Sequence, residues 1–203
     1  MQDTGIRNIS INPDWLYHQI YSETLDDIIN DGAIKSRKEL ISQKEKLKDL
    51  EPVGFNGFSY VSVAKRVSEI STDSSCFNNF IFGQYALIIE NCQAIKTIQC
   101  DNELLARIIS IIPQPIRLSY WADEYQIKKE IKLDKIVGIK IPEKGINFTP
   151  RRNSYVSPER GIDLFLTVME KHNYYLPFID IEYAKEIKVD SIKEYILERE
   201  KIN

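Results

Sequence analysis

The sequence of 203 residues predicts an α+β fold, and three observations lead to this class. Short segments with the apolar patterns of β-strands are spread along the chain. Helical patterns with recognisable start and stop signals lie between these segments and near the C-terminus. The two kinds of pattern do not alternate regularly, which disfavours a doubly wound parallel sheet. We therefore expect packed sheets with helices near the N-terminal side and at the C-terminus.

The first elements are predicted from local signals near the N-terminus. Residues 15–20 are rich in aromatic and branched side chains, as in a short strand. Ser22 is a favoured N-cap residue, Leu25 and Ile28 have helical spacing, and Gly32 occupies the place of a C-cap glycine. A strand followed by a short helix is therefore expected over the first thirty-odd residues.

Later elements follow from the same signals. The central part is expected to hold a helix over 36–47, strands over 58–63 and 85–90, a helix over 104–112, and strands over 120–127 and 135–141. Residues 145–157 form a basic loop pattern. Pro158 follows a serine and opens a helix that ends near His172, and a last helix follows Asp190.

The composition narrows the classes of function. Hydrophobic residues make up 43% of the chain, which is ordinary for a globular protein. The formal net charge is -3, so the chain lacks the strongly basic composition that is typical of proteins that bind duplex nucleic acid. No apolar run approaches the roughly 18 residues that span a bilayer, and no signal-peptide pattern opens the chain. We expect a cytoplasmic protein without a membrane partner, or one delivered into a target cell without a classical signal peptide.

Neither the cysteines nor the spacing of candidate metal ligands indicates a bound metal. The three cysteines are odd in number and show no C-x-x-C spacing, which disfavours a disulfide framework and a zinc site. No P-loop, dinucleotide glycine motif or metal-ligand spacing occurs. The sequence therefore predicts no bound metal.

Three segments combine chemistry-bearing residues with strand patterns. The first carries His18 and precedes the helix that ends at Gly32, the second carries Tyr60, and the third carries Glu124. Glu124 is the most informative, because its neighbours include Trp121 and Tyr125, and a carboxylate in apolar surroundings is costly without a purpose. Each residue also has a structural interpretation: a hydrogen-bonded strand histidine, a core tyrosine and an exposed acid on an edge strand.

Taken in order, these segments resemble the ADP-ribosyltransferase superfamily, in particular its H-Y-E branch. The resemblance covers residues 16 to about 141. It implies an ADP-ribosyltransferase-like split β-sandwich. We expect a catalytic domain over 1–150 and a C-terminal helical extension over 151–203 that packs on the same domain, although residues from Pro158 onward have no counterpart in the family.

The resemblance assigns roles in a reaction of NAD. Glu124 would hold the ribose hydroxyls and stabilise the oxocarbenium-like state that forms when the nicotinamide bond breaks. His18 would bond the adenosine-side ribose and orient NAD, and Tyr60 would pack on the nicotinamide ring.

Further NAD contacts follow with looser positional matches. Ser62 shares a strand face with Tyr60, and Arg37 is a candidate for the pyrophosphate because its guanidinium forms paired hydrogen bonds. Tyr17 and Phe80 complete the expected binding set, with core packing as the alternative for Phe80.

The function expected from the resemblance is a bacterial, toxin-type mono-ADP-ribosyltransferase that uses NAD as a substrate. Arginine-modifying members carry an acid or Gln two residues before the catalytic Glu, where this chain has Ala122. Arginine is therefore disfavoured as the acceptor. The acidic net charge favours a protein acceptor, and an antitoxin or immunity protein is a candidate partner.

Two alternatives stay open. The best candidate for binding an anionic partner is a basic cluster of Lys140, Lys144, Arg151 and Arg152. One alternative is therefore a nucleic-acid-directed transferase. The other alternative is a catalytically inactive binding or interaction module of the same fold.

Overall fold

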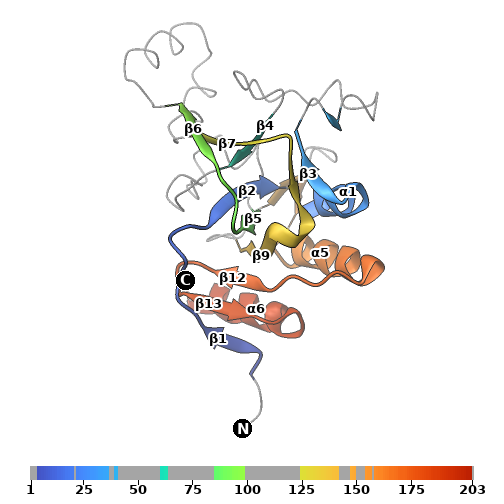
Figure 1. Ribbon diagram of the computed structural model, residues 1–203. Helices are drawn as coiled ribbons and strands as arrows, with labels where there is room; N and C mark the ends of the chain where they lie inside the picture. The colour runs from blue at the N-terminus through green and yellow to red at the C-terminus, as the bar shows by residue number, and fades with distance from the viewer. Residues whose placement is uncertain are drawn as a thin grey trace, which may run out of the picture.

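The structure is a computed structural model that describes residues 4–20, 22–36, 39–40, 60–63, 85–98, 124–141, 147–149, 154–156 and 158–202. Short strands and a few helices make up these ranges, and the expected α+β class is confirmed (Figure 1). The strand pairs among the described residues are antiparallel except for one, in which β9 and β12 run parallel.

The strands are β1 (Ile6–Asn8), β2 (Leu16–Ile20), β3 (Ala33–Lys35), β4 (Tyr60–Val63), β5 (Tyr85–Ile89), β6 (Ile95–Ile98), β7 (Glu124–Lys128), β8 (Glu130–Lys132), β9 (Ile136–Lys140), β10 (Asn147–Thr149), β11 (Ser154–Val156), β12 (Phe178–Asp180) and β13 (Lys185–Ile187). The helices are α1 (Leu25–Asp31), α5 (Pro158–His172) and α6 (Ile192–Ile202), with 3₁₀ turns η1 (Ser22–Thr24), η6 (Leu133–Lys135) and η8 (Val189–Ser191).

Two sheets dominate the arrangement. The larger has six strands in the order β1-β13-β12-β9-β5-β2, and the smaller has three in the order β4-β7-β6. Strand β2 at the end of the first sheet contacts β4 at the end of the second without pairing with it. Figure 1 shows the three-stranded sheet above the six-stranded one, with this seam between them. Two further pairs, β3-β8 and β10-β11, are not hydrogen-bonded to these sheets, although β3 and β8 both contact β4.

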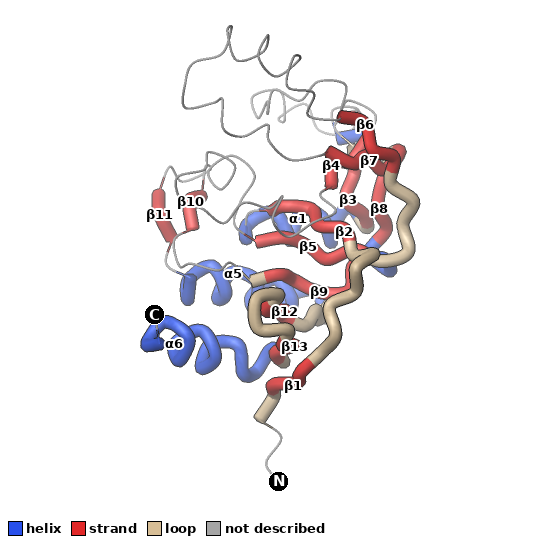
Figure 2. The backbone as a smooth tube through the Cα atoms, turned by 90° about the vertical axis from the view of Figure 1, so that its left-hand side faces the viewer, coloured by secondary structure: helices blue, strands red, loops and turns tan. Residues whose placement is uncertain are grey.

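Helices α5 and α6 cover one face of the six-stranded sheet. Phe165 of α5 packs edge-on against Tyr85 at 4.6 Å and against Phe178 at 6.2 Å between ring centroids. Ile192 and Ile196 of α6 are buried in the same hydrophobic cluster. Figure 2 shows both helices on the same side of β9 and β12. The apolar stripe of each helix is therefore what fixes it to the sheet.

The opposite face of this sheet carries a second, smaller cluster. Trp15 and Tyr17 of the β2 segment pack there with Ala86, Ile88 and Ile179. The indole N–H of Trp15 donates to a carboxylate oxygen of Glu90, which satisfies the polar atom that its burial would otherwise leave unpaired. Strand β2 is thus buried on both faces.

Most of the predicted elements within the described ranges are present. The strand at 15–20 is β2, and the helix after it is α1, which ends at Gly32 with φ 72° in the left-handed region. Thr24, not Ser22, precedes α1, because Ser22 opens the 3₁₀ turn η1 instead. The strands β4, β5, β7 and β9 and the helices α5 and α6 also match the prediction.

Other expectations are corrected or lie elsewhere. The basic loop expected over 145–157 contains an antiparallel hairpin of β10 and β11, with Phe148 opposite Tyr155. Residues 37–38 and 41–47 of the helix expected over 36–47, and the helix expected over 104–112, lie outside the described residues. None of the helices in the described ranges has the length and apolar character needed to cross a bilayer.

The segment after residue 150 supplies strands as well as helices. Strand β12 pairs in parallel with β9, and β13 joins β12 to the N-terminal strand β1. These strands of three residues leave too short a pattern to be recognised, so only the helices of this segment were predicted. The division of the chain at residue 150 stays a prediction.

Candidate functional site

Strand β2 places His18 beside the seam between the two sheets. His18 lies opposite Leu87 of β5, and its side chain is half-buried. It alternates with Tyr17 and shares its face with Leu16 and Ile20, which belong to the larger hydrophobic cluster. The histidine therefore lies on an otherwise apolar strand face at the end of the sheet.

Strands β4 and β7 are antiparallel neighbours in a defined register. Val61 lies opposite Ile127, and both are buried in the core together with Val63. Because side chains alternate along a strand, these residues identify the core-facing side of β4 and β7.

The intervening positions belong to the other face of the same two strands. Tyr60 is opposite Lys128, and Ser62 is opposite Gln126. Glu124 has the same parity as Gln126 and Lys128, so all five positions share this face. The backbone thereby groups three residues of the predicted set on one side of the small sheet.

The strands that carry the predicted residues are consecutive in space. Strand β2 contacts β4, and β4 pairs with β7, so that the positions of His18, Tyr60 and Glu124 lie on three neighbouring strands across the seam. The side chains of Tyr60, Ser62 and Glu124 lie outside the described part of the structure, as do Arg37 and Phe80 entirely.

Tyr17 requires a correction. Its side chain is 3% exposed and packs in the smaller hydrophobic cluster, on the face of β2 opposite to His18. Burial raises the pKa of the Tyr17 phenol to about 12. The adjacent positions 17 and 18 point to opposite faces, so the Tyr17 side chain belongs to the core and not to a surface shared with His18.

The basic cluster predicted from the sequence also needs a correction, because one of its members is buried. Lys140 is 1% exposed and lies in β9, opposite Ala86 of β5, so it is not a surface residue. The other three members, Lys144, Arg151 and Arg152, lie outside the described residues. The strand pattern of residues 135–141 places this lysine in a sheet interior, a context that charge counting along the sequence does not capture.

Helix α1, which follows the His18 strand, is attached to the end of α5 by charged groups. Asp26 accepts bonds from Lys171 Nζ at 2.8 and 3.0 Å, and its Oδ1 lies 2.6 Å from His172 Nε2. The hydrogen bond from Lys171, and next that from His172, lower the pKa of the Asp26 carboxyl. These contacts hold the chain after β2 against α5, whose apolar face is already fixed to the sheet.

Lys128 is a residue that the sequence analysis did not single out. Its side chain is exposed, and it lies directly opposite Tyr60 on the strand face of Glu124. Gln126 has the corresponding position opposite Ser62. Strand alternation from Glu124 was the available signal, because it selects residues two and four positions along.

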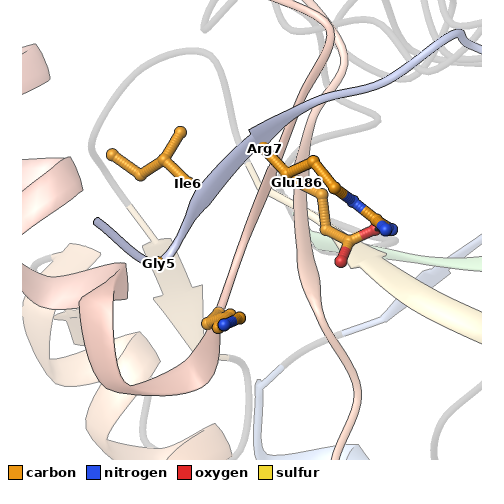
Figure 3. Close-up of a pocket in the computed structure, with 5 residues that line it drawn as sticks. Gly5, Ile6, Arg7 and Glu186 are labelled. Carbon is orange, nitrogen blue, oxygen red and sulfur yellow. Dashed lines mark hydrogen bonds and ion pairs between the residues drawn. The ribbon is translucent and has the colours of Figure 1, made fainter. Parts of the chain in front are cut away.

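A surface hollow lies at the other end of the six-stranded sheet. A surface hollow lined by Gly5, Ile6, Arg7, Glu186 and Lys188 is drawn in Figure 3. Arg7 Nη2 lies 2.6 Å from Glu186 Oε2 there. Strand β1 is at the far end of the six-stranded sheet from β2, so the hollow is separate from the seam. In the part of the chain that the structure describes, His, Cys, Asp and Glu side chains form no group of three suited to a metal.

Comparisons with known proteins give one structural likeness. Neither a protein-family model nor a curated protein matches the sequence. The chain is similar in structure to Thermus sp. 2.9 DarT in complex with NAD+, at 11% sequence identity and a TM-score of 0.41. The similarity covers 80% of this chain and 91% of that one.

Proposed function

We propose that the chain is an NAD-dependent mono-ADP-ribosyltransferase with an ADP-ribosyltransferase-like split β-sandwich. The observation that supports this most is that three strands are neighbours in space: β2 contacts β4, and β4 pairs with β7. Segments that resemble the family's His, Tyr and Glu strands lie far apart in the chain, and the strands that carry their key residues are adjacent. Chance matches to three short motifs have no reason to fall on three adjoining strands.

The proposed reaction breaks the bond between nicotinamide and the ribose C1′ of NAD. Nicotinamide leaves with the electron pair of that bond, and positive charge develops on the ribose ring. A nucleophilic atom of the acceptor then forms a bond to C1′ and loses its proton. The Glu124 carboxylate holds the ribose hydroxyls and faces the developing positive charge, which lowers the barrier electrostatically.

The other proposed residues bind and orient NAD. His18 bonds the adenosine-side ribose, and Tyr60 packs on the nicotinamide ring. Ser62 follows Tyr60 on the same strand face and bonds a ribose. Arg37 and Phe80 stay proposed contacts of the pyrophosphate and of the nicotinamide ring.

The acceptor is proposed to be a macromolecule other than an arginine side chain. Ala122 occupies the position where arginine-modifying members carry an acid or Gln. The net charge of -3 favours a protein over a nucleic acid. The proposed setting is that of a bacterial toxin-type enzyme, whose activity an antitoxin or immunity protein would restrain.

The acceptor class can be tested by transfer from labelled NAD. NAD labelled with ³²P in the adenylate phosphate is incubated with a cell lysate and the purified chain, and the product is treated with protease or with nuclease. We expect label that is released by protease, and none with Glu124→Gln. Glu130→Gln is the matched control, because Glu130 is an exposed acid on the adjoining strand β8.

Each result of this experiment has a definite meaning. Label released by nuclease instead would replace the protein acceptor with a nucleic acid. Equal labelling by wild type and by Glu124→Gln would contradict the role of Glu124. If wild type transfers no label and releases no nicotinamide, the chain is a binding module without this chemistry.

A further inference from the structure

We propose that the outer edge of strand β1 binds an extended acidic segment of a partner protein as an added antiparallel strand. Strand β1 ends the six-stranded sheet, and among the described residues only β13 pairs with it. Figure 1 shows β1 at the border of the sheet, beyond β13. Exposed strand edges offer unpaired backbone groups, to which extended peptides bind by strand addition. The inference does not depend on the proposed transferase activity.

The backbone bonds of β1 show which of its groups face β13. The Lys188 N–H donates to the Gly5 carbonyl at 2.7 Å, and the Ile9 N–H donates to the Ala184 carbonyl at 2.9 Å. Hydrogen-bonded positions alternate along an antiparallel pair, so Arg7, midway between Gly5 and Ile9, also directs its backbone groups to β13.

The two other residues of β1 direct their backbone groups outward. The N–H and C=O of Ile6 and Asn8 point away from β13, because these positions alternate with Arg7. No backbone bond joins them to another segment in the part of the chain that the structure describes. Asn8 is exposed and Ile6 is half-buried. An incoming antiparallel strand can therefore form paired bonds with both residues.

The side chain of Arg7 defines the charge of the partner. Its Nη2 donates to Glu186 Oε2 at 2.6 Å, and the side chain is 71% exposed. A guanidinium has several further N–H donors that can bind a second carboxylate. In the added pair Arg7 takes the non-hydrogen-bonded position, where opposite Cα atoms are about 4.5 Å apart and side chains are closest. A carboxylate opposite Arg7 would therefore form a charge-assisted pair.

The surface hollow beside β1 carries the same preference. Gly5, Ile6 and Arg7 line it together with Glu186 and Lys188, so two cationic side chains outnumber one carboxylate there. Figure 3 shows the side chains of Ile6 and Arg7 on opposite sides of β1. An acidic residue opposite Arg7 would share the face of Glu186. An apolar residue opposite Ile6 would extend the side that packs against the larger hydrophobic cluster.

A second copy of the chain fits this edge less well. Two β1 edges related by a two-fold axis through the middle of the strand would place the two Arg7 side chains directly opposite each other. Like charges at directly opposite positions destabilise strand pairing. The complementary occupant is therefore an acidic strand of a different protein.

The charge preference is tested with the whole chain and a synthetic peptide, acetyl-Thr-Thr-Glu-Val-Thr-amide, whose Glu is designed to lie opposite Arg7. Titration to millimolar concentrations is followed by amide chemical shifts in NMR spectra, and we expect saturable shifts at residues 6–8 and 185–188. A peptide with Lys in place of Glu should bind at least about tenfold more weakly. Arg7→Gln should remove this difference, and Lys132→Gln, which removes an exposed lysine of β8, should keep it.

Methylation of single peptide nitrogens tests strand addition itself. The N–H of the peptide's Val points toward β1, because Val takes the hydrogen-bonded position opposite Ile6, whereas the N–H of its Glu points away. N-methylation of Val should weaken binding by about fivefold or more, which corresponds to about 1 kcal/mol for one hydrogen bond. N-methylation of Glu should have little effect.

The inference is overturned if the spectra show no saturable shifts, if the Glu and Lys peptides bind equally, or if the two methylated peptides bind equally. Sedimentation of the chain without peptide tests the other occupant. Asn8→Pro removes an N–H that points outward, so it leaves the pairing with β13 intact. A dimer that this substitution converts to a monomer would replace the acidic partner with a second copy, whereas a wild-type monomer agrees with the inference.

Discussion

Tyr17 and His18 are adjacent in the sequence, and the alternation of strand β2 gives them different environments. Tyr17 packs in the smaller hydrophobic cluster, whereas His18 is half-buried on the opposite face, near the seam with β4. When both faces of a strand are packed, a side chain on it can reach a ligand only where no neighbouring element covers it. Strand β2 is the end strand of its sheet, so one of its edges has no paired strand in that sheet. At the scale of single residues, position in the alternation decides which side chain is core and which can meet a ligand.

The buried phenol of Tyr17 leads to a prediction about alkaline stability. Its pKa is raised from 10.0 to about 12, so the unfolded chain loses this proton at lower pH than the folded chain. The stabilisation is fully present below about pH 10 and is lost as the pH rises towards 12. Wild type should therefore lose about 1 kcal/mol more of its unfolding free energy between pH 9 and pH 11 than Tyr17→Phe.

Urea unfolding at the two pH values measures this difference. The other tyrosines titrate in both proteins, so the comparison isolates Tyr17. Equal losses in wild type and Tyr17→Phe would contradict a buried, protonated phenol at this position.

At the scale of elements, helix α5 connects the sheet to the segment that follows His18. Its Phe165 ring packs on Tyr85, which lies opposite Ile20 of β2. Its last turn contacts Asp26 of α1 through Lys171 and His172. Helix α5 therefore contacts the sheet next to β2 through Phe165, and contacts α1 through the charged residues of its last turn.

The packing of Phe165 is testable by truncation of its side chain. The residue is fully buried, so Phe165→Ala should lower the unfolding free energy by about 3–5 kcal/mol. Glu170→Ala removes an exposed side chain of the same helix and should change stability by less than about 0.5 kcal/mol. Chemical denaturation of both variants provides the measurement, and a similar small effect for the two would contradict the described core.

Elements with strong local signals were predictable from the sequence, and elements held by their neighbours were not. The C-cap at Gly32 and the helix start at Pro158 each depend on residues within one helical turn. A local sequence pattern is therefore enough to predict them. The three-residue strands β1, β12 and β13 depend on pairing with partners far away in sequence. Their register is a tertiary property that no local window includes.

Some features of the candidate site were likewise predictable from the sequence, and others were not. The strands of His18, Tyr60 and Glu124 were predictable from their aromatic and branched residues. The register that sets Lys128 opposite Tyr60 was not, because it depends on how two distant strands align. Lys140 was misjudged for the same reason, since charge counting does not reveal a sheet interior.

At the scale of the whole molecule, the two ends of the chain meet in one sheet. Strand β1 pairs with β13, and β12 pairs with β9 from the middle of the chain. Helices α5 and α6 contribute Ile162, Phe165 and Ile192 to the same core as Leu87 and Ile139. The six-stranded sheet that ends at β2 is therefore assembled from sequence before and after residue 150.

Truncation tests this interdependence. A chain that ends before Pro158 loses α5, β12, β13 and α6, and so exposes the face of β5 and β9 that α5 covers. We expect it to lack a cooperative thermal transition and the near-ultraviolet circular dichroism of packed aromatic rings. A stable, cooperatively unfolding product would instead support an independent domain over 1–150.

The central claim is that the chain cleaves NAD with Glu124 as the catalytic carboxylate. Its most direct test is nicotinamide release from NAD by the purified chain, measured by chromatography at millimolar NAD. The account predicts steady release by wild type and by Glu130→Gln, and a loss of at least about a hundredfold with folded Glu124→Gln. Absence of release from wild type, or release that survives the Glu124→Gln substitution, would contradict it.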